Sequence, residues 1–331
     1  AGQIIAAAEA MGFVCTKAMP YQVDISTGGS VLMFLPHEFY PAMVSDRGLP
    51  SLCLSPGSLA EGQGLAGLLR SWAAHDDVQF QGDLCEVGVL GLHCDGVQYT
   101  SSMRAGGSKS VVVGSVNVVS GTDELKHRRQ PLFVIRKTRL CQCGCQGFHT
   151  IQELMEVLSW SMRCIASGRS PSTRHDGSAW SPHDEGKRIA DDLLIPKAAL
   201  LQIRGDWEWL EQCFRLRSVS SDSFCWMCNA TQRIDGPLDF QDFSPAAAHR
   251  QTLISHHSYL EATAQENSQL SHLFRCPGTE LQHLTVDVMH AGDLGTFHDA
   301  LGSLFWLEVT HKDFYSNRKA GLEGLNRDLN F

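Results

Sequence analysis

The clearest pattern of apolar segments separated by polar connections lies in the middle of the chain, where three strand-like segments follow one another. Residues 86–100 are apolar on both faces until His93 and Asp95, which predicts a central strand covered on both sides. Residues 110–119 are rich in β-branched side chains, and residues 131–137 form a third apolar run. Because short polar connections separate these segments, we predict an antiparallel meander.

A helix and a returning strand are predicted next. Apolar residues recur at helical spacing from Thr150, and Gly168 ends this pattern. Thr150 and Glu153 have the spacing of a capping box, so we expect the helix to begin there. Residues 198–204 predict a fourth strand, with Asp206 just past its carboxyl end. The order β-β-β-α-β predicts an α/β fold, a mixed sheet flanked by helices.

Four parts can be distinguished along the chain. Residues 1–80 form an accessory N-terminal region, with one helix predicted over residues 58–74. Residues 86–214 form the first part of the core, and residues 215–283 read as an insertion that contains cysteines and histidines. Residues 284–331 are expected to complete the core as a helical part.

The last part holds one further predicted helix, over residues 291–309. The first residue is Ala rather than Met, and Asn330 and Phe331 do not resemble a finished terminus. We therefore expect the sequence to be a fragment of a longer polypeptide.

Composition narrows the class of protein. The 331 residues are 43% hydrophobic and 19% charged, a balance that excludes wholesale disorder. No apolar run approaches the roughly 18–20 residues that a membrane span needs, so a membrane protein is not expected. The formal net charge is −9, and nucleic-acid binding would therefore depend on a local basic patch.

A basic patch is a candidate for such binding. It lies around the connection between the second and third predicted strands and just beyond the third. These side chains could contact phosphates without reading sequence, and the alternative is a solvated hairpin tip. The patch comprises Lys126, His127, Arg128, Arg129, Arg136, Lys137 and Arg139.

Two aspartates are candidates for metal chemistry. Asp95 interrupts an apolar strand, where a carboxylate must be paired, neutral or metal-bound; alternatively, Asp95 and Gly96 form a turn. Asp206 follows a strand at the position where α/β sheets bind ligands; alternatively, it caps a helix. If the fourth strand lies beside the first, the two carboxylates meet at one edge. Such oxygen ligands suit Mg²⁺ or Mn²⁺, and a pair of these ions can promote phosphodiester cleavage.

The twelve cysteines are clustered, which favours metal ligands over a disulfide framework. Cys225 and Cys228 form a CxxC, a common half of a structural zinc site. Buried core cysteines and a redox pair are the alternatives. The sequence does not choose among the candidates for the other half, which are His256, His257, His272, Cys276 and His283.

A second cysteine group, Cys141, Cys143 and Cys145 with His149, could also bind zinc. Gly144 and Gly147 would allow a tight loop there. The alternative is a cysteine-rich turn that joins a strand to a helix.

A third motif, Asp287-Val-Met-His290, places a carboxylate and an imidazole one turn apart if the segment is helical. Alone it is a weak signal. Taken in order, four strings resemble a cut-and-paste DNA transposase of the CACTA type, including the transposon-derived reading frames found in dinoflagellates. The strings are His93-Cys-Asp95-Gly96, Arg204-Gly-Asp206-Trp207, Cys225-Trp-Met-Cys228 and Asp287-Val-Met-His290.

The resemblance covers roughly residues 86–310 and carries several implications. It implies a ribonuclease-H-like core with the first catalytic Asp on the first strand and the second after the fourth. Asp95 and Asp206 would then hold catalytic Mg²⁺ or Mn²⁺, and Asp287 and His290 would form the DxxH element. The final acid would be Glu308, Glu323 or a residue beyond Phe331. Structural Zn²⁺, DNA transposon ends as the partner, a homo-oligomer and an intracellular, nuclear location are further expectations. The alternative is an inactive, zinc-stabilised module that binds nucleic acid or protein.

Overall fold

The computed structural model describes residues 19–98, 109–120, 129–184, 187, 192–265, 268–287 and 303. It divides into two compact units, Ala1–Thr285 and Val286–Phe331. The candidate sites whose geometry is described below belong to the first unit. The helix predicted over residues 291–309 lies outside the described residues, apart from Ser303.

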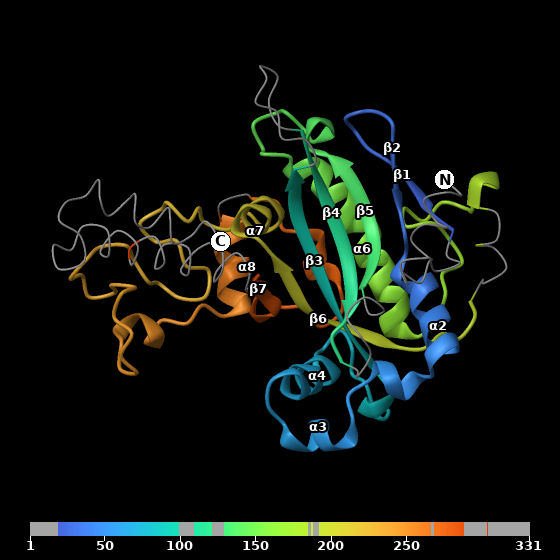
Figure 1. Ribbon diagram of the computed structural model, residues 1–331, viewed down its shortest axis with the longest axis horizontal. Helices are drawn as coiled ribbons and strands as arrows, with labels where there is room; N and C mark the ends of the chain where they lie inside the picture. The colour runs from blue at the N-terminus through green and yellow to red at the C-terminus, as the bar shows by residue number, and fades with distance from the viewer. Residues whose placement is uncertain are drawn as a thin grey trace, which may run out of the picture. The chain divides into compact units, whose positions relative to one another are not determined.

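A mixed five-stranded sheet forms the centre of the fold, with the strand order β5-β4-β3-β6-β7 (Figure 1). β3 pairs antiparallel with β4, β4 pairs antiparallel with β5, and β3 pairs parallel with β6. The predicted meander and the mixed α/β class are therefore confirmed, with strand ends shifted by a few residues. The strands are β3 (Gly88–Gln98), β4 (Ser110–Val118), β5 (Arg129–Arg136), β6 (Ala198–Gly205) and β7 (Leu284–Val286).

Helices cover the two faces of this sheet. Val89 packs with Ala199 and Leu201 against α3 (Pro56–Glu61) and α4 (Leu65–Ala74). Since alternate residues of a strand face opposite sides, Cys94 belongs to the other face. That side carries α6 (Phe148–Ser167), which packs on β6, and α7 (Trp207–Phe214), which packs on β3. Gln152 of α6 joins the two helices by donating to the Cys213 carbonyl of α7 at 2.8 Å.

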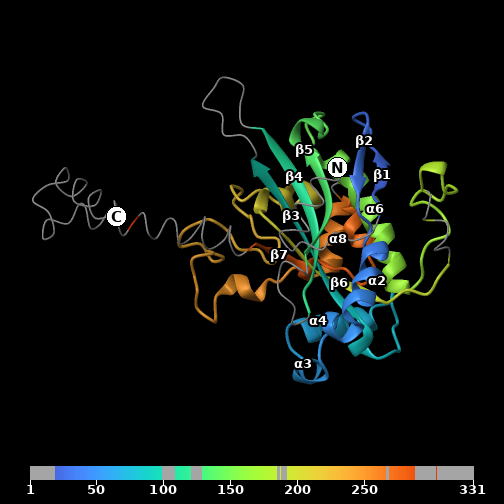
Figure 2. The same cartoon turned by 45° about the vertical axis from the view of Figure 1, so that its right-hand side comes forward.

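The N-terminal region packs on this core. β1 (Tyr21–Asp24) and β2 (Ser30–Met33) form an antiparallel hairpin that stands beside β5 and α6 (Figures 1 and 2). The N–H of Phe34 donates to the carbonyl of Leu132 at 2.8 Å and links this hairpin to β5. α2 (Pro36–Arg47) follows the hairpin and contacts α6.

Two helix predictions were wrong. The helix expected over residues 58–74 is two helices, because Gly62 (φ +71°) ends α3 in a left-handed conformation and α4 begins only after Gly64. The capping box at Thr150 is absent, since α6 begins two residues earlier, after Gly147. Thr150 Oγ1 instead accepts the N–H of Cys141 at 3.0 Å, and the carboxylate of Glu153 accepts the N–H of Ser26 at 3.1 Å. Both side chains therefore form hydrogen bonds with tertiary partners and do not cap the helix.

The stretch between α7 and β7 contains α8 (His256–Gln265) and little other regular structure. Isolated bridges join Cys228 to Leu253 and Thr231 to Asp239. Among the described residues, no helix has both the length and the apolar character that a bilayer crossing requires. Short 3₁₀ segments occur at Leu49–Leu52, Leu84–Glu86, Lys137–Arg139, Pro182–Asp184, Ala248–Gln251, His272–Arg275 and Leu281–His283.

Candidate functional site

The structure brings Asp95 and Asp206 to one edge of the sheet. In the parallel pairing of β3 with β6, Cys94 lies opposite Gly205, so the next residue of β3 is Asp95 and the residue directly after β6 is Asp206. Neighbouring strands are about 4.8 Å apart, and residues in register have side chains on the same face. We call Asp95 and Asp206 the acid pair.

Each aspartate had a structural alternative. Asp95 lies inside β3, which continues to Gln98, so the alternative of a turn at this position is wrong. Asp206 does cap a helix: its Oδ1 accepts the N–H of Trp209 at 2.6 Å at the start of α7. A carboxylate has a second oxygen, so this cap fixes the orientation of Asp206 without excluding a ligand role.

The buried thiol of Cys94 reports the electrostatics of this edge. Burial raises the pKa of Cys94 well above its usual value, and the negative charges of the nearby Asp95 and Asp206 raise it further. Both carboxylates therefore act on the same sulfur, Asp95 from β3 and Asp206 from the position directly after β6. Cys94 remains a neutral thiol and is no nucleophile for this site.

A Cys/His cluster lies in the connection from β5 to α6. The ligand atoms of its four residues all lie within 4.8 Å of one another. Nδ1 of His149 is 3.3 Å from Sγ of Cys143 and 3.8 Å from Sγ of Cys141. Three sulfurs and one imidazole match a structural zinc site, so this group could hold a zinc-type metal ion. The Cys/His cluster comprises Cys141, Cys143, Cys145 and His149.

Local backbone geometry produces this convergence. Gly144 (φ +90°) and Gly147 (φ +87°) adopt left-handed conformations that fold the loop back onto the first turn of α6, where His149 lies. Burial raises the pKa of Cys145, but this effect is outweighed by hydrogen bonds, chiefly from the N–H of His149, and the pKa falls to about 7. A thiol that ionises this readily is suited to metal binding.

Cys225 and Cys228 come together without a third ligand in the part of the chain that the structure describes. Their sulfurs are 3.6 Å apart, and the N–H of Met227 lies 3.4 Å from Sγ of Cys225. Several of the predicted further ligands have other partners. Nδ1 of His256 accepts the N–H of Leu281 at 3.2 Å, Nδ1 of His283 accepts the N–H of Glu280 at 2.8 Å, and Nδ1 of His272 lies 3.8 Å from Glu156.

The predicted basic patch is divided. Lys126, His127 and Arg128 lie outside the described residues. Arg129 and Arg136 are exposed at the two ends of β5. Lys137 pairs with Glu208 at 3.0 Å, and Arg139 donates to the carbonyls of Gly28 and Ser30, where it supports the β1–β2 hairpin.

The DxxH motif cannot be placed as a unit. Asp287 belongs to the second compact unit, and His290 lies outside the described residues. Its proposed role therefore stays a prediction.

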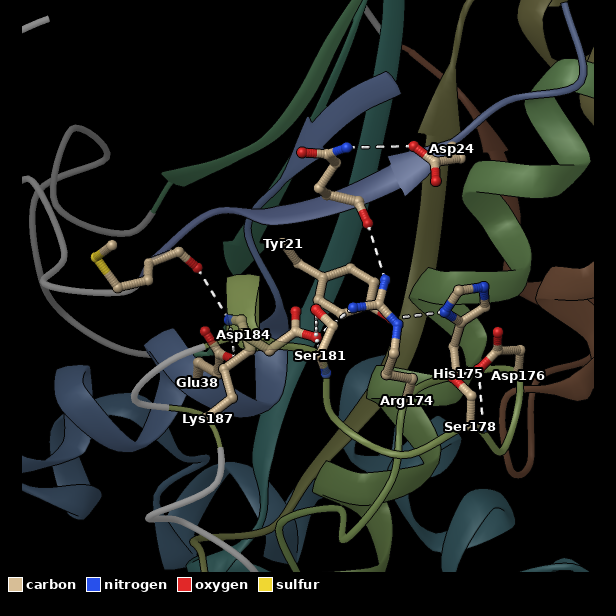
Figure 3. Close-up of polar contacts among 12 residues, drawn as sticks. Tyr21, Asp24, Glu38, Arg174, His175, Asp176, Ser178, Ser181, Asp184 and Lys187 are labelled. Carbon is tan, nitrogen blue, oxygen red and sulfur yellow. Dashed lines mark hydrogen bonds and ion pairs between the residues drawn. The ribbon is translucent and has the colours of Figure 1, made fainter. Parts of the chain in front are cut away.

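Sequence reasoning missed a buried ion-pair group that joins β1 and α2 to the segment after α6 (Figure 3). Asp184 is only 3% exposed and accepts hydrogen bonds from Arg174 and from the N–H and hydroxyl of Ser181. Lys187 pairs with Glu38. No local pattern could reveal these partners, which come from three separate stretches of sequence. The ion-pair group comprises Tyr21, Glu38, Arg174, His175, Ser181, Asp184 and Lys187.

Tyr21 packs against two members of this group. The Arg174 guanidinium lies 4.6 Å from the centre of the Tyr21 ring, and the Tyr21 hydroxyl hydrogen-bonds Nδ1 of His175 at 2.7 Å. Burial raises the pKa of Tyr21 to about 12. This arrangement suits a structural role, because each charged side chain of the group is paired with an opposite charge inside it.

No protein-family model matches this sequence, and no curated protein matches it either. The candidate sites therefore stand on their geometry. Among the residues that the structure describes, the acid pair and the Cys/His cluster have ligand types that suit a metal ion.

Proposed function

We propose that this chain is a ribonuclease-H-like, transposase-type enzyme that cleaves DNA and transfers strands with a divalent metal ion. The observation that carries the proposal is the register of β3 and β6, which sets Asp95 beside Asp206. The transposase resemblance implies three antiparallel strands and a fourth strand that returns beside the first. It also implies one aspartate on the first strand and one after the fourth, and the strand order of this chain agrees with that arrangement.

The acid pair has the chemistry that Mg²⁺ or Mn²⁺ requires. Carboxylate oxygens are hard ligands, and the N–H of Trp209 holds Oδ1 of Asp206 and so fixes the orientation of this carboxylate. Ions bound there would activate water or a 3′-hydroxyl and stabilise the leaving oxygen of a phosphodiester. The two candidates for a final acid, Glu308 and Glu323, lie outside the described residues.

Replacement of either aspartate tests the proposal. We expect Asp95→Asn and Asp206→Asn each to reduce Mg²⁺- or Mn²⁺-dependent cleavage of DNA by about 10³-fold or more. Asn caps helices as well as Asp does, so Asp206→Asn should keep α7 intact. The measurement is cleavage of end-labelled terminal-repeat DNA, with Asp192→Asn, an exposed carboxylate paired with Arg169, as the matched control. Cleavage at the wild-type rate by either site variant would refute the assignment.

A catalytically inactive, zinc-stabilised module that binds nucleic acid or protein is the second candidate function. It is favoured by the fact that, within the described residues, the Cys/His cluster is the one group of three or more potential metal ligands that converge. This alternative predicts DNA or protein binding by the wild-type chain together with no metal-dependent cleavage.

A further inference from the structure

On the face of the sheet that carries the acid pair, polar side chains continue towards the amino ends of β3 and β6. The strand register aligns Val113 with Asp95, and the next row on that face contains Ser115, His93 and Arg204. Alternate residues of a strand share a face, so this row lies directly below the acid pair. His93 and Arg204 of this row are partly exposed, whereas Ser115 is buried, as is Val89 farther along β3.

Arg204 is held in this row by a residue from two strands away. Nη2 of Arg204 donates to Oδ1 of Asn117 at 2.9 Å. Asn117 lies on β4 and Arg204 on β6, so the bond crosses β3 at Gly91, which is the register partner of Asn117. A Cβ atom at Gly91 would lie 3.1 Å from the Asn117 side-chain oxygen and 2.8 Å from Val119. Glycine at this position therefore leaves room for the Asn117 side chain.

We infer that Arg204 contacts a backbone phosphate of the nucleic acid at the acid pair, and that Asn117 is its positioning residue. The inference rests on the proposed function and names how that site would hold its substrate. A guanidinium is planar and always charged, and its fork of donors matches two phosphate oxygens. Asn117 restricts the rotation of this fork, so less conformational freedom is lost when the phosphate binds.

The salt dependence of DNA binding tests the contact separately from cleavage. The probe is a fluorescein-labelled DNA duplex of mixed sequence, titrated by the full chain in Ca²⁺, an ion with the same preference for oxygen ligands as Mg²⁺. We expect Arg204→Gln to weaken binding about tenfold at low salt. The slope of log affinity against log salt should become shallower by about 0.7–0.9, the loss of one phosphate contact. Arg204→Lys should retain the slope, because it retains the charge.

A double-mutant cycle tests the role of Asn117. We expect Asn117→Ala to weaken DNA binding about threefold, and to add nothing when it is combined with Arg204→Gln, because Asn117 acts only through Arg204. Arg169→Gln, at an exposed arginine paired with Asp192, is the matched control and should leave affinity and slope unchanged. Thermal unfolding of each variant establishes that the fold is retained.

The outcomes separate this inference from the proposed function. Unchanged affinity and slope in Arg204→Gln, or no DNA binding by the wild-type chain, would overturn the phosphate contact. Additive effects of Asn117→Ala and Arg204→Gln would overturn the positioning role. If the slope changes but cleavage does not depend on Asp95, the phosphate contact stands and the proposed catalysis fails. If Asp95→Asn abolishes cleavage while Arg204→Gln binds DNA normally, the proposed catalysis stands and the phosphate contact fails.

Discussion

The Cys/His cluster and the ion-pair group are both polar sites beside α6, but they are built in opposite ways. The cluster takes all its ligands from residues 141–149, and two of them, Cys143 and His149, are exposed. The ion-pair group joins Glu38 to Lys187 and Asp184 to Arg174, and these side chains are mostly buried. A local site can form wherever its loop and helix form, whereas a long-range group exists only in the complete fold.

This difference predicts which site the stability of the metal-free chain depends on. The ion-pair group holds its charges out of water, so removal of one partner leaves the other uncompensated. The Cys/His cluster without metal contributes thiols that are partly solvated. Stability should therefore respond strongly to changes in the ion-pair group, and should respond to the cluster only when metal is present.

The largest expected effect is that of Asp184→Asn. This change keeps the shape of the side chain but removes the negative charge that pairs with Arg174. Because the Arg174 side chain is only 18% exposed, water cannot fully compensate its positive charge. We expect the free energy of unfolding to fall by about 3 kcal/mol, measured by urea denaturation at neutral pH. The matched control is Asp192→Asn, whose partner Arg169 is exposed, and its effect should stay below about 1 kcal/mol. Equal effects of the two changes would contradict the structural role of the ion-pair group.

The next largest effect is stabilisation by zinc. At a free Zn²⁺ concentration 100 times the dissociation constant of the cluster, the chain should gain about 2.7 kcal/mol of unfolding free energy. Cys143→Ser should abolish this gain without changing the stability of the metal-free chain, because Cys143 is exposed. Cys225→Ser is the control, since no third ligand joins Cys225 and Cys228 in the described part of the chain. The measurement combines zinc content with urea unfolding in the presence of zinc or a chelator. Loss of the zinc effect in Cys225→Ser would mean that zinc binds at Cys225 and Cys228 instead of at the Cys/His cluster.

The same contrast explains how far the sequence could predict the molecule. Periodicity located β3, β4, β5 and β6 to within a few residues, because each is an apolar segment bounded by polar connections. The spacing of Cys141, Cys143, Cys145 and His149 was sufficient to nominate a local metal site. The start of α6 was missed because Thr150 and Glu153 bind Cys141 and Ser26, which are tertiary partners.

Pairs of distant residues set the limit of prediction. The adjacency of Asp95 and Asp206 was expected only on the condition that the fourth strand returned beside the first, and the register of β3 with β6 meets that condition. The bond from Arg204 to Asn117 and the pairing of Glu38 with Lys187 had no sequence signal. Such contacts depend on how whole elements pack, and periodicity describes only one element at a time.

The smallest expected effect is that of pH on the ion-pair group between pH 5 and 8. Burial raises the pKa of Asp184, but hydrogen bonds from Ser181 and Arg174 and the charge of Arg174 outweigh it, so the pKa lies below its usual 3.8. A carboxyl whose pKa is lowered by folding stabilises the fold above its unfolded pKa, and this contribution is lost as the pH falls through the lower folded value. The stability gap between wild type and Asp184→Asn should therefore stay constant from pH 8 to 5 and shrink only below about 3.8.

Zinc stabilisation should respond to pH much earlier, because protons compete for thiolate ligands whose ordinary pKa is about 8.5. Urea unfolding of the wild-type chain and of Asp184→Asn across this range, with and without zinc, measures both effects in one series. The zinc-dependent part should decline between pH 8 and 5 while the Asp184-dependent part does not. If both declined together, Asp184 would share the titration of the metal ligands, and the separation between a local, metal-dependent site and a long-range, buried one would fail.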